Sequence, residues 1–244
     1  MKSKTVAVVD YGSGNLRSVS QAVVHVAAGS GLEVLVTSDP QAVFDAERVV
    51  LPGQGHMADC MNELAASGLK EAVLHAAANK PLFGVCVGMQ MLLDRSEEGP
   101  TDGLGLIPGE VVRFRLEGRL QADGSRYKVP QMGWNQVFHD LGRGVAHPLW
   151  TGIDEGAYFY FVHSYYARPS HAQHCVGETD YGGRFAAAIA RDNVFVGLPH
   201  DGQSGLGLLA TIGFPIQFCL IYPKPQKPYL AFLLEELKNH TAST

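Results

Sequence analysis

Residues 81–90 read PLFGVCVGMQ, and their pattern is the clearest indication of the fold. Pro81–Val87 is a short, continuous apolar run, which is typical of a strand buried on both faces. It passes directly into a helical pattern that we expect to run from Met89 to about Arg95. The sequence therefore predicts a strand that turns sharply into a helix at the carboxyl edge of a sheet.

Cys86 occupies that turn, with Gly84 and Gly88 two residues away on either side. Glycines at these positions prevent side-chain clashes in a sharp turn. A thiol at a helix N-terminus faces unpaired N–H groups, so we expect its pKa to be lowered. The amide of Val87 is placed to face an oxyanion formed on a substrate carbonyl. The pattern favours a nucleophile at Cys86; the simpler alternative is a buried structural cysteine.

The segments around this stretch alternate between strand and helix patterns up to about residue 110, and strand-like segments follow. The expected strands in the first half are 5–10, 33–37 and 48–51, with helical patterns near 16–26 and over 61–78. We therefore predict an α/β fold: an open, mostly parallel sheet with helices on both faces and an antiparallel or mixed extension.

The C-terminal residues have a different character. Between Val196 and Thr244 there are five prolines, at 199, 215, 223, 225 and 228, which argue against regular structure. A helical pattern returns only at 229–238. We assign residues 1–210 to one domain and 211–244 to a divergent tail.

Composition excludes several classes of protein. The chain has 244 residues, is 46% hydrophobic and 18% charged, and carries a formal net charge of −5 without a basic cluster, so we expect no nucleic-acid partner. We expect no membrane span, because no apolar run approaches about 20 residues. Asp10 interrupts the first apolar run, unlike a signal peptide, and the four cysteines are scattered. The sequence predicts a cytoplasmic protein without a metal site.

Six motifs together resemble the class I glutamine amidotransferase family. They are DYGSGNLRSV (10–19), LPGQG (51–55), GVCVGMQMLL (84–93), VPQMGWNQV (129–137), YFVHSYY (160–166) and GRFAAAIARDNVF (183–195). The first and fourth resemble the branch that supplies the glutaminase subunit of imidazole glycerol phosphate synthase in histidine biosynthesis. The similarity runs from Thr5 to about Phe195.

This resemblance implies a role for each matching residue. Cys86 attacks the amide of L-glutamine and forms a γ-glutamyl thioester. The loop around Gly53 and the amide of Val87 hold the oxyanion, and Gln90 and Glu98 hold the substrate, with Glu98 facing its α-amino group. The backbone of His163, Ser164 and Tyr165 lines the substrate; the alternative for this segment is a buried strand with its aromatic side chains packed inward. Gln131 replaces a histidine that is more usual in the family, near the segment that meets the synthase partner.

The family supplies its catalytic base in a His-Pro-Glu sequence that this chain lacks. Counted from Phe195 without a gap, the family's histidine falls on His200, its proline on Asp201 and its glutamate on Gly202. We expect His200 to be the base, with its orienting carboxylate lost. A solvent-exposed loop histidine is the alternative for His200.

The resemblance implies a glutaminase without a cofactor that supplies ammonia to a (β/α)₈ cyclase subunit. The sequence is also compatible with two other hypotheses. One is a pseudo-glutaminase that docks on the cyclase but turns over little substrate, because the His-Pro-Glu motif is lost. The other is a related amidotransferase that serves a different ammonia acceptor.

Overall fold

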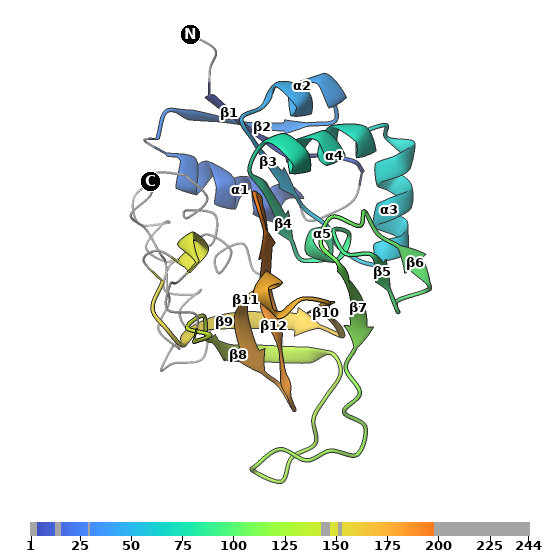
Figure 1. Ribbon diagram of the computed structural model, residues 1–244, viewed down its shortest axis with the longest axis vertical. Coiled ribbons are helices and arrows are strands. Elements are labelled where there is room, and N and C mark those ends of the chain that lie inside the picture. The colour runs from blue at the N-terminus through green and yellow to red at the C-terminus, as the bar shows by residue number, and fades with distance from the viewer. Residues whose placement is uncertain (1–3, 13–15, 29, 143–146, 151–152, 198–244) are drawn as a thin grey trace, which may run out of the picture.

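The computed structural model describes residues 4–12, 16–28, 30–142, 147–150 and 153–197 (Figure 1). The predicted domain boundary at 210, the helical pattern at 229–238 and His200 lie outside these residues. Within the described residues, no helix has both the length and the apolar character needed to cross a membrane.

A parallel half of the sheet contains the first four strands of the chain together with β13. Its strands lie in the order β2-β1-β3-β4-β13. Their bounds are β1 Lys4–Val9, β2 Leu32–Thr37, β3 Arg48–Leu51, β4 Leu82–Val85 and β13 Val194–Gly197. The central strands are apolar along their length because both of their faces are covered. The expected strands at 5–10, 33–37 and 48–51 are confirmed.

Helices pack against this half of the sheet, with α1 on one side of β3 and β4 and with α3 and α4 on the other (Figure 1). Their bounds are α1 Leu16–Ala27, α2 Pro40–Asp45, α3 Met57–Ala66 and α4 Lys70–Asn79. The single helix expected over 61–78 is wrong. The chain forms two helices there, because Gly68 takes a left-handed conformation (φ +74°) and ends α3.

The helix expected from Met89 to Arg95 is also wrong. The helix α5 comprises only Val87–Gln90. Beyond it, the carbonyls of Met91, Leu92 and Leu93 accept hydrogen bonds from the backbone of residues 104–107 instead of from a following helical turn. The chain then enters the short strand β5 (Arg95–Ser96), which pairs with β6 (Thr101–Asp102).

The second half of the chain extends the sheet with largely antiparallel strands, as predicted. The sheet continues from β13 in the order β12-β10-β7-β5-β6, and β11 pairs with β12. The bounds are β7 Gly109–Arg113, β10 Tyr165–Pro169, β11 Cys175–Asp180 and β12 Arg184–Arg191. Parallel β4 and β13 therefore lie at the centre of one mixed sheet.

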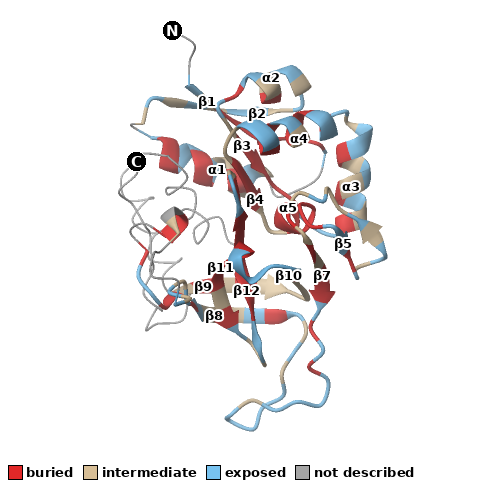
Figure 2. Cartoon of the chain, in the orientation of Figure 1, coloured by how far each residue is buried: buried red, intermediate tan, exposed pale blue. Residues whose placement is uncertain are grey.

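A separate two-stranded ribbon is formed by β8 (Gln131–Val137) and β9 (Ala157–His163). Short 3₁₀ turns lie at Pro148–Trp150, before β9, and at Ala172–His174, before β11. In Figure 1 the ribbon lies beside β12 at the end of the molecule away from α2, next to the long connection between β7 and β8. Burial is concentrated in β3, β4 and α5, whereas most of that connection is exposed (Figure 2).

Candidate active site

Cys86 lies in the turn between β4 and α5 and has a strained backbone. Its φ and ψ angles are 56° and −117°, a region that residues with a side chain rarely occupy. Strain of this kind persists only where the surroundings enforce it, and it is common at functional sites. The residue is half-buried. The predicted sharp strand-to-helix turn with a cysteine at its tip is confirmed.

The glycines around Cys86 are required by close backbone contacts. A Cβ added to Gly84 would lie 2.6 Å from Cγ1 of Val196, and one added to Gly88 would overlap the carbonyl oxygen of Leu51. A Cβ on Gly53 would overlap the backbone nitrogen of Gly88. The loop after β3 therefore packs backbone against backbone on the turn that carries Cys86.

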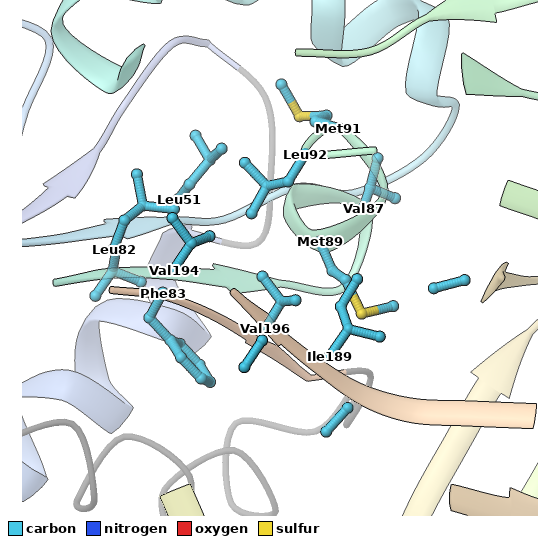
Figure 3. Packing of buried hydrophobic residues seen from close by; sticks show 14 of the residues in the cluster. Leu51, Leu82, Phe83, Val87, Met89, Met91, Leu92, Ile189, Val194 and Val196 are labelled. Atoms are coloured by element: carbon cyan, nitrogen blue, oxygen red, sulfur yellow. The ribbon is translucent and has the colours of Figure 1, made fainter. Parts of the chain in front are cut away.

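Apolar side chains from the surrounding strands fix α5 in place. Figure 3 shows Met89 with Ile189 and Val196, from β12 and β13, and Leu92 close to Leu51 of β3. Met89 and Leu92 are completely buried. Because the helix has one turn, this packing, rather than its own hydrogen bonds, holds it.

The thiol of Cys86 does not have the lowered pKa that the sequence predicted. Burial raises the pKa of Cys86 to about 11, and the nearby Cys60 and Glu98 act in the same direction. The N–H of Val87 acts in the opposite direction but is outweighed. A four-residue helix provides little dipole, whereas burial in apolar surroundings disfavours the thiolate. A base is therefore needed to remove the thiol proton at neutral pH.

Glu98 and Gln90 both lie near Cys86. The Glu98 carboxylate accepts a hydrogen bond from the backbone N–H of Met57 at 3.2 Å, at the start of α3, and lies 3.6 Å from Nδ1 of His56. Its side chain is 14% exposed. The Gln90 side chain is buried, and its Oε1 has no hydrogen-bond partner among the described residues. Both side chains thus retain polar atoms that a small polar substrate can use.

His163, Ser164 and Tyr165 form the junction between β9 and β10, and β10 packs against α5. The carbonyl of Ser164 accepts a hydrogen bond from Phe114 N at 3.0 Å. The imidazole of His163 has Nδ1 2.8 Å from the carbonyl oxygen of Tyr165 and Nε2 3.0 Å from Oε1 of Gln131. The Gln131 side chain therefore points inward, toward this segment.

The structure thus brings Cys86, Val87, Gly53, Gln90 and Glu98 together at the carboxyl edge of the parallel strands, with the 163–165 segment next to α5. Two residues of this region were not singled out from the sequence. They are Tyr11 and Cys60, whose side chains donate hydrogen bonds to the loop around Gly53. Tyr11 lies in the quoted motif at 10–19, whereas Cys60 has no distinguishing sequence pattern.

The chain is similar in sequence to a protein family and to several individual proteins. A family model described as glutamine amidotransferase class-I matches residues 7–198. The imidazole glycerol phosphate synthase subunit HisH of Aromatoleum aromaticum is 52% identical over 209 residues, covering 84% of this chain and 96% of that protein. The HisH subunit of Dechloromonas aromatica is 50% identical over 212 residues, covering 86% and 95%.

Solved structures with low sequence identity share the fold. One, a crystal structure of a glutamine amidotransferase, has a TM-score of 0.61 at 14% identity and covers 84% of this chain and 94% of its own. PurLQS from Thermotoga maritima has a TM-score of 0.59 at 17% identity, covering 86% and 97%. The glutaminase domain of Trypanosoma brucei CTPS with bound acivicin has a TM-score of 0.55 at 15% identity, covering 86% and 92%.

Proposed function

Because this chain belongs to the class-I glutamine amidotransferase family, we propose that it is the glutaminase subunit of an imidazole glycerol phosphate synthase, hydrolysing L-glutamine in histidine biosynthesis. Identities of about 50% to HisH subunits over most of the chain support this assignment. The strained cysteine at the turn between β4 and α5 is the observation that carries the chemistry. The proposed compartment is the cytoplasm.

The proposed reaction begins with attack of the Cys86 sulfur on the γ-amide carbon of glutamine. The carbonyl electrons move onto oxygen, and the N–H of Val87 and the loop around Gly53 are proposed to stabilise this oxyanion. The contact of Val87 with Cys86 and the close approach of Gly53 to Gly88 support this role. Collapse of the intermediate breaks the C–N bond, and ammonia leaves with an added proton. Water then hydrolyses the γ-glutamyl thioester, releasing glutamate and restoring the thiol.

A base must accept the thiol proton, because the pKa of Cys86 lies above neutral pH. We assign this role to His200 on its sequence position alone. An imidazole is suited to taking the proton from sulfur and returning it to the departing nitrogen. The absence of glutamate two residues later, where Gly202 stands, removes an orienting group and lowers the expected rate.

The substrate is proposed to lie between Glu98 and the 163–165 segment. The Glu98 carboxylate is largely shielded from water, so it provides a strong partner for the α-ammonium group of glutamine. Gln90 supplies a buried amide close by, and the backbone of Ser164 and Tyr165 completes the proposed pocket. These contacts select an amino acid amide over an unsubstituted amide.

The proposed partner is a (β/α)₈ cyclase subunit, with which the chain forms a heterodimer and to which it supplies ammonia. The ribbon β8–β9 offers a surface for this contact. Met132 is 65% exposed, and the half-buried Trp134 and Tyr160 face each other across the ribbon with ring centroids 5.4 Å apart. Exposed apolar and aromatic side chains of this kind are typical of protein interfaces.

Glutamate release by the mixed subunits tests the proposal. The wild-type chain should release glutamate, Cys86→Ala should reduce the rate to background, and His200→Ala should lower it by at least about a hundredfold. A glutamine-mimicking electrophile should label Cys86 in the complex. Labelling of another residue would contradict the assignment of the nucleophile. An unchanged rate in His200→Ala would overturn the assignment of the base.

The loss of the His-Pro-Glu sequence favours one alternative, a pseudo-glutaminase that docks on the cyclase and turns over little substrate. In that case, the chain would bind the partner, and Cys86 would retain a stoichiometric γ-glutamyl adduct that water does not hydrolyse. Mass spectrometry of the complex after incubation with glutamine distinguishes this outcome from turnover. Complementation of a histidine auxotroph distinguishes both from an amidotransferase with another acceptor.

A further inference from the structure

The loop Pro52–Gly55 accepts hydrogen bonds from two buried side chains that the proposed reaction does not use. The hydroxyl of Tyr11 donates a hydrogen bond to the carbonyl oxygen of Pro52 at 2.8 Å. The thiol of Cys60, on α3, donates to the carbonyl oxygen of Gln54 at 3.2 Å. Tyr11 is 3% exposed and Cys60 is fully buried.

These two anchors also contact each other and the turn at Cys86. The Tyr11 hydroxyl interacts with Cys60 and lies 3.7 Å from Sδ of Met91, directly after α5. Burial raises the pKa of Tyr11 far above its ordinary value, so the hydroxyl keeps its proton at neutral pH and can donate it in a hydrogen bond. Residues at the end of β1, in the first half of α3 and directly after α5 are therefore in contact next to the loop.

Anchoring the carbonyls determines where the loop's amides point. A peptide group is planar, so fixing the Pro52 oxygen also fixes the direction of the Gly53 N–H. Fixing the Gln54 oxygen does the same for the N–H of Gly55. Gly53 and Gly55 would otherwise give this segment wide conformational freedom. The peptide between the two anchored groups lies against the backbone of Gly88.

We propose that Tyr11 and Cys60 are positioning residues that fix the Pro52 and Gln54 carbonyls and so hold the loop Pro52–Gly55 in a defined conformation beside Cys86. This proposal rests on the function proposed above. Removing either anchor allows the loop to rotate between conformations. The loop then spends less time in a conformation that can stabilise the oxyanion, although the groups that bind glutamine are unchanged. The effect therefore falls on kcat and not on KM.

Tyr11→Phe tests the first anchor, because it removes one oxygen and keeps the ring. In the complex with the cyclase subunit, kcat for glutamate release should fall about tenfold while KM stays within twofold. Tyr181→Phe is the matched control, since the Tyr181 hydroxyl donates to a carbonyl of Lys128 at 2.9 Å, in a different part of the fold. An unchanged or increased kcat in Tyr11→Phe would overturn the proposal.

Cys60 allows a rescue experiment. Cys60→Ala removes the donor to Gln54 and should lower kcat about as much as Tyr11→Phe does, whereas Cys60→Ser keeps a donor and should restore most of the rate. Cys175→Ala is the control, because Cys175 is a second buried thiol, with Sγ 3.5 Å from the carbonyl oxygen of Gly177. Equal rates for Cys60→Ala and Cys60→Ser would contradict the anchoring role.

Hydrogen exchange provides a readout that does not depend on activity. The amides of residues 53–55 should exchange at least about fivefold faster in Tyr11→Phe than in the wild type, and Tyr181→Phe should leave them unchanged. If the wild-type complex released no glutamate, the function proposed above would fail, and exchange alone would decide whether the anchors hold the loop. Unchanged exchange in Tyr11→Phe would exclude the anchor.

Discussion

The turn at Cys86 and the ribbon β8–β9 are stabilised in different ways. At the turn, the loop after β3 and the start of α5 touch through their backbones, and a single methyl group at Gly53 or Gly88 would overlap main-chain atoms. In the ribbon, side chains make the contacts, with Trp134 against Tyr160 on one face and Gln131 against His163 on the other.

The two regions therefore tolerate substitution to different degrees. Backbone groups cannot move aside without shifting a strand of the central sheet, so the turn has no room for larger residues. Exposed side chains in the ribbon can adopt other rotamers, so that surface can change without loss of the fold. The polar pair Gln131 and His163 should tolerate substitution less well than the exposed side chains, because replacing one residue leaves a polar group of the other without its partner.

The largest expected difference is between the thiols of Cys86 and Cys175, one at the turn and one in the antiparallel extension. Below a pKa of about 11, the thiolate fraction of Cys86 rises about tenfold for each pH unit. Alkylation of Cys86 by iodoacetamide should therefore accelerate about a thousandfold from pH 7 to pH 10. Mass spectrometry measures both rates, and Cys175, which is buried, should react far more slowly throughout.

The direction of this pH dependence follows from burial, which favours the neutral thiol. If the helix dipole lowered the pKa of Cys86 instead, the thiolate would already be populated at pH 7, and the alkylation rate would be almost independent of pH. A flat profile would thus contradict the raised pKa. Circular dichroism at each pH verifies that the chain remains folded.

Gly88→Ala should have the next largest effect. The added Cβ overlaps the Leu51 carbonyl, and neither backbone can yield without disturbing β3 or α5. We expect a loss of about 3 kcal/mol in the free energy of unfolding, measured by urea denaturation. Gly118→Ala, in the connection between β7 and β8, is the comparison variant. Gly118 has a positive φ but open space around it, so an added methyl group strains the backbone without overlapping another atom. A loss in Gly88→Ala no larger than that in Gly118→Ala would contradict the overlap with the Leu51 carbonyl.

Gln131→Leu should cost about 2 kcal/mol of unfolding free energy. The substitution removes the buried amide that faces Nε2 of the half-buried His163. Thr179→Val is a matched control, since Thr179 is as buried as Gln131. Its hydroxyl donates a hydrogen bond at 2.7 Å to the carbonyl of Gln136, which lies on β8 like Gln131. A loss in Gln131→Leu far below that in Thr179→Val would contradict a stabilising role for the contact between Gln131 and His163.

The smallest expected effect is that of Met132→Ala on stability. Met132 is exposed on the outer face of the ribbon, so the free energy of unfolding should change by less than about 0.5 kcal/mol. The affinity for the cyclase subunit, measured by titration calorimetry, should fall by about tenfold, because an exposed apolar contact is lost. A large stability loss with unchanged affinity would place Met132 in the fold and not in the interface.

Local sequence patterns were sufficient to predict the parallel strands and the cysteine turn. Buried strands need continuous apolar runs, and a sharp turn with little space needs glycines, so both leave a mark within ten residues. The family motifs likewise placed Gly53, Gln90 and Glu98 near Cys86. These predictions depend on residues close in sequence or on whole motifs.

Contacts between distant segments decided what the sequence could not. The helix after Cys86 stops at Gln90 because the backbone of residues 104–107 takes the next carbonyls, which no local pattern signals. Burial of the thiol, which only packing can produce, raised the pKa of Cys86 and outweighed the dipole of a single helical turn. The contacts of Tyr11 and Cys60 with the loop Pro52–Gly55 have the same origin. Separate elements of the chain must fold together before these side chains come within hydrogen-bonding distance of the loop.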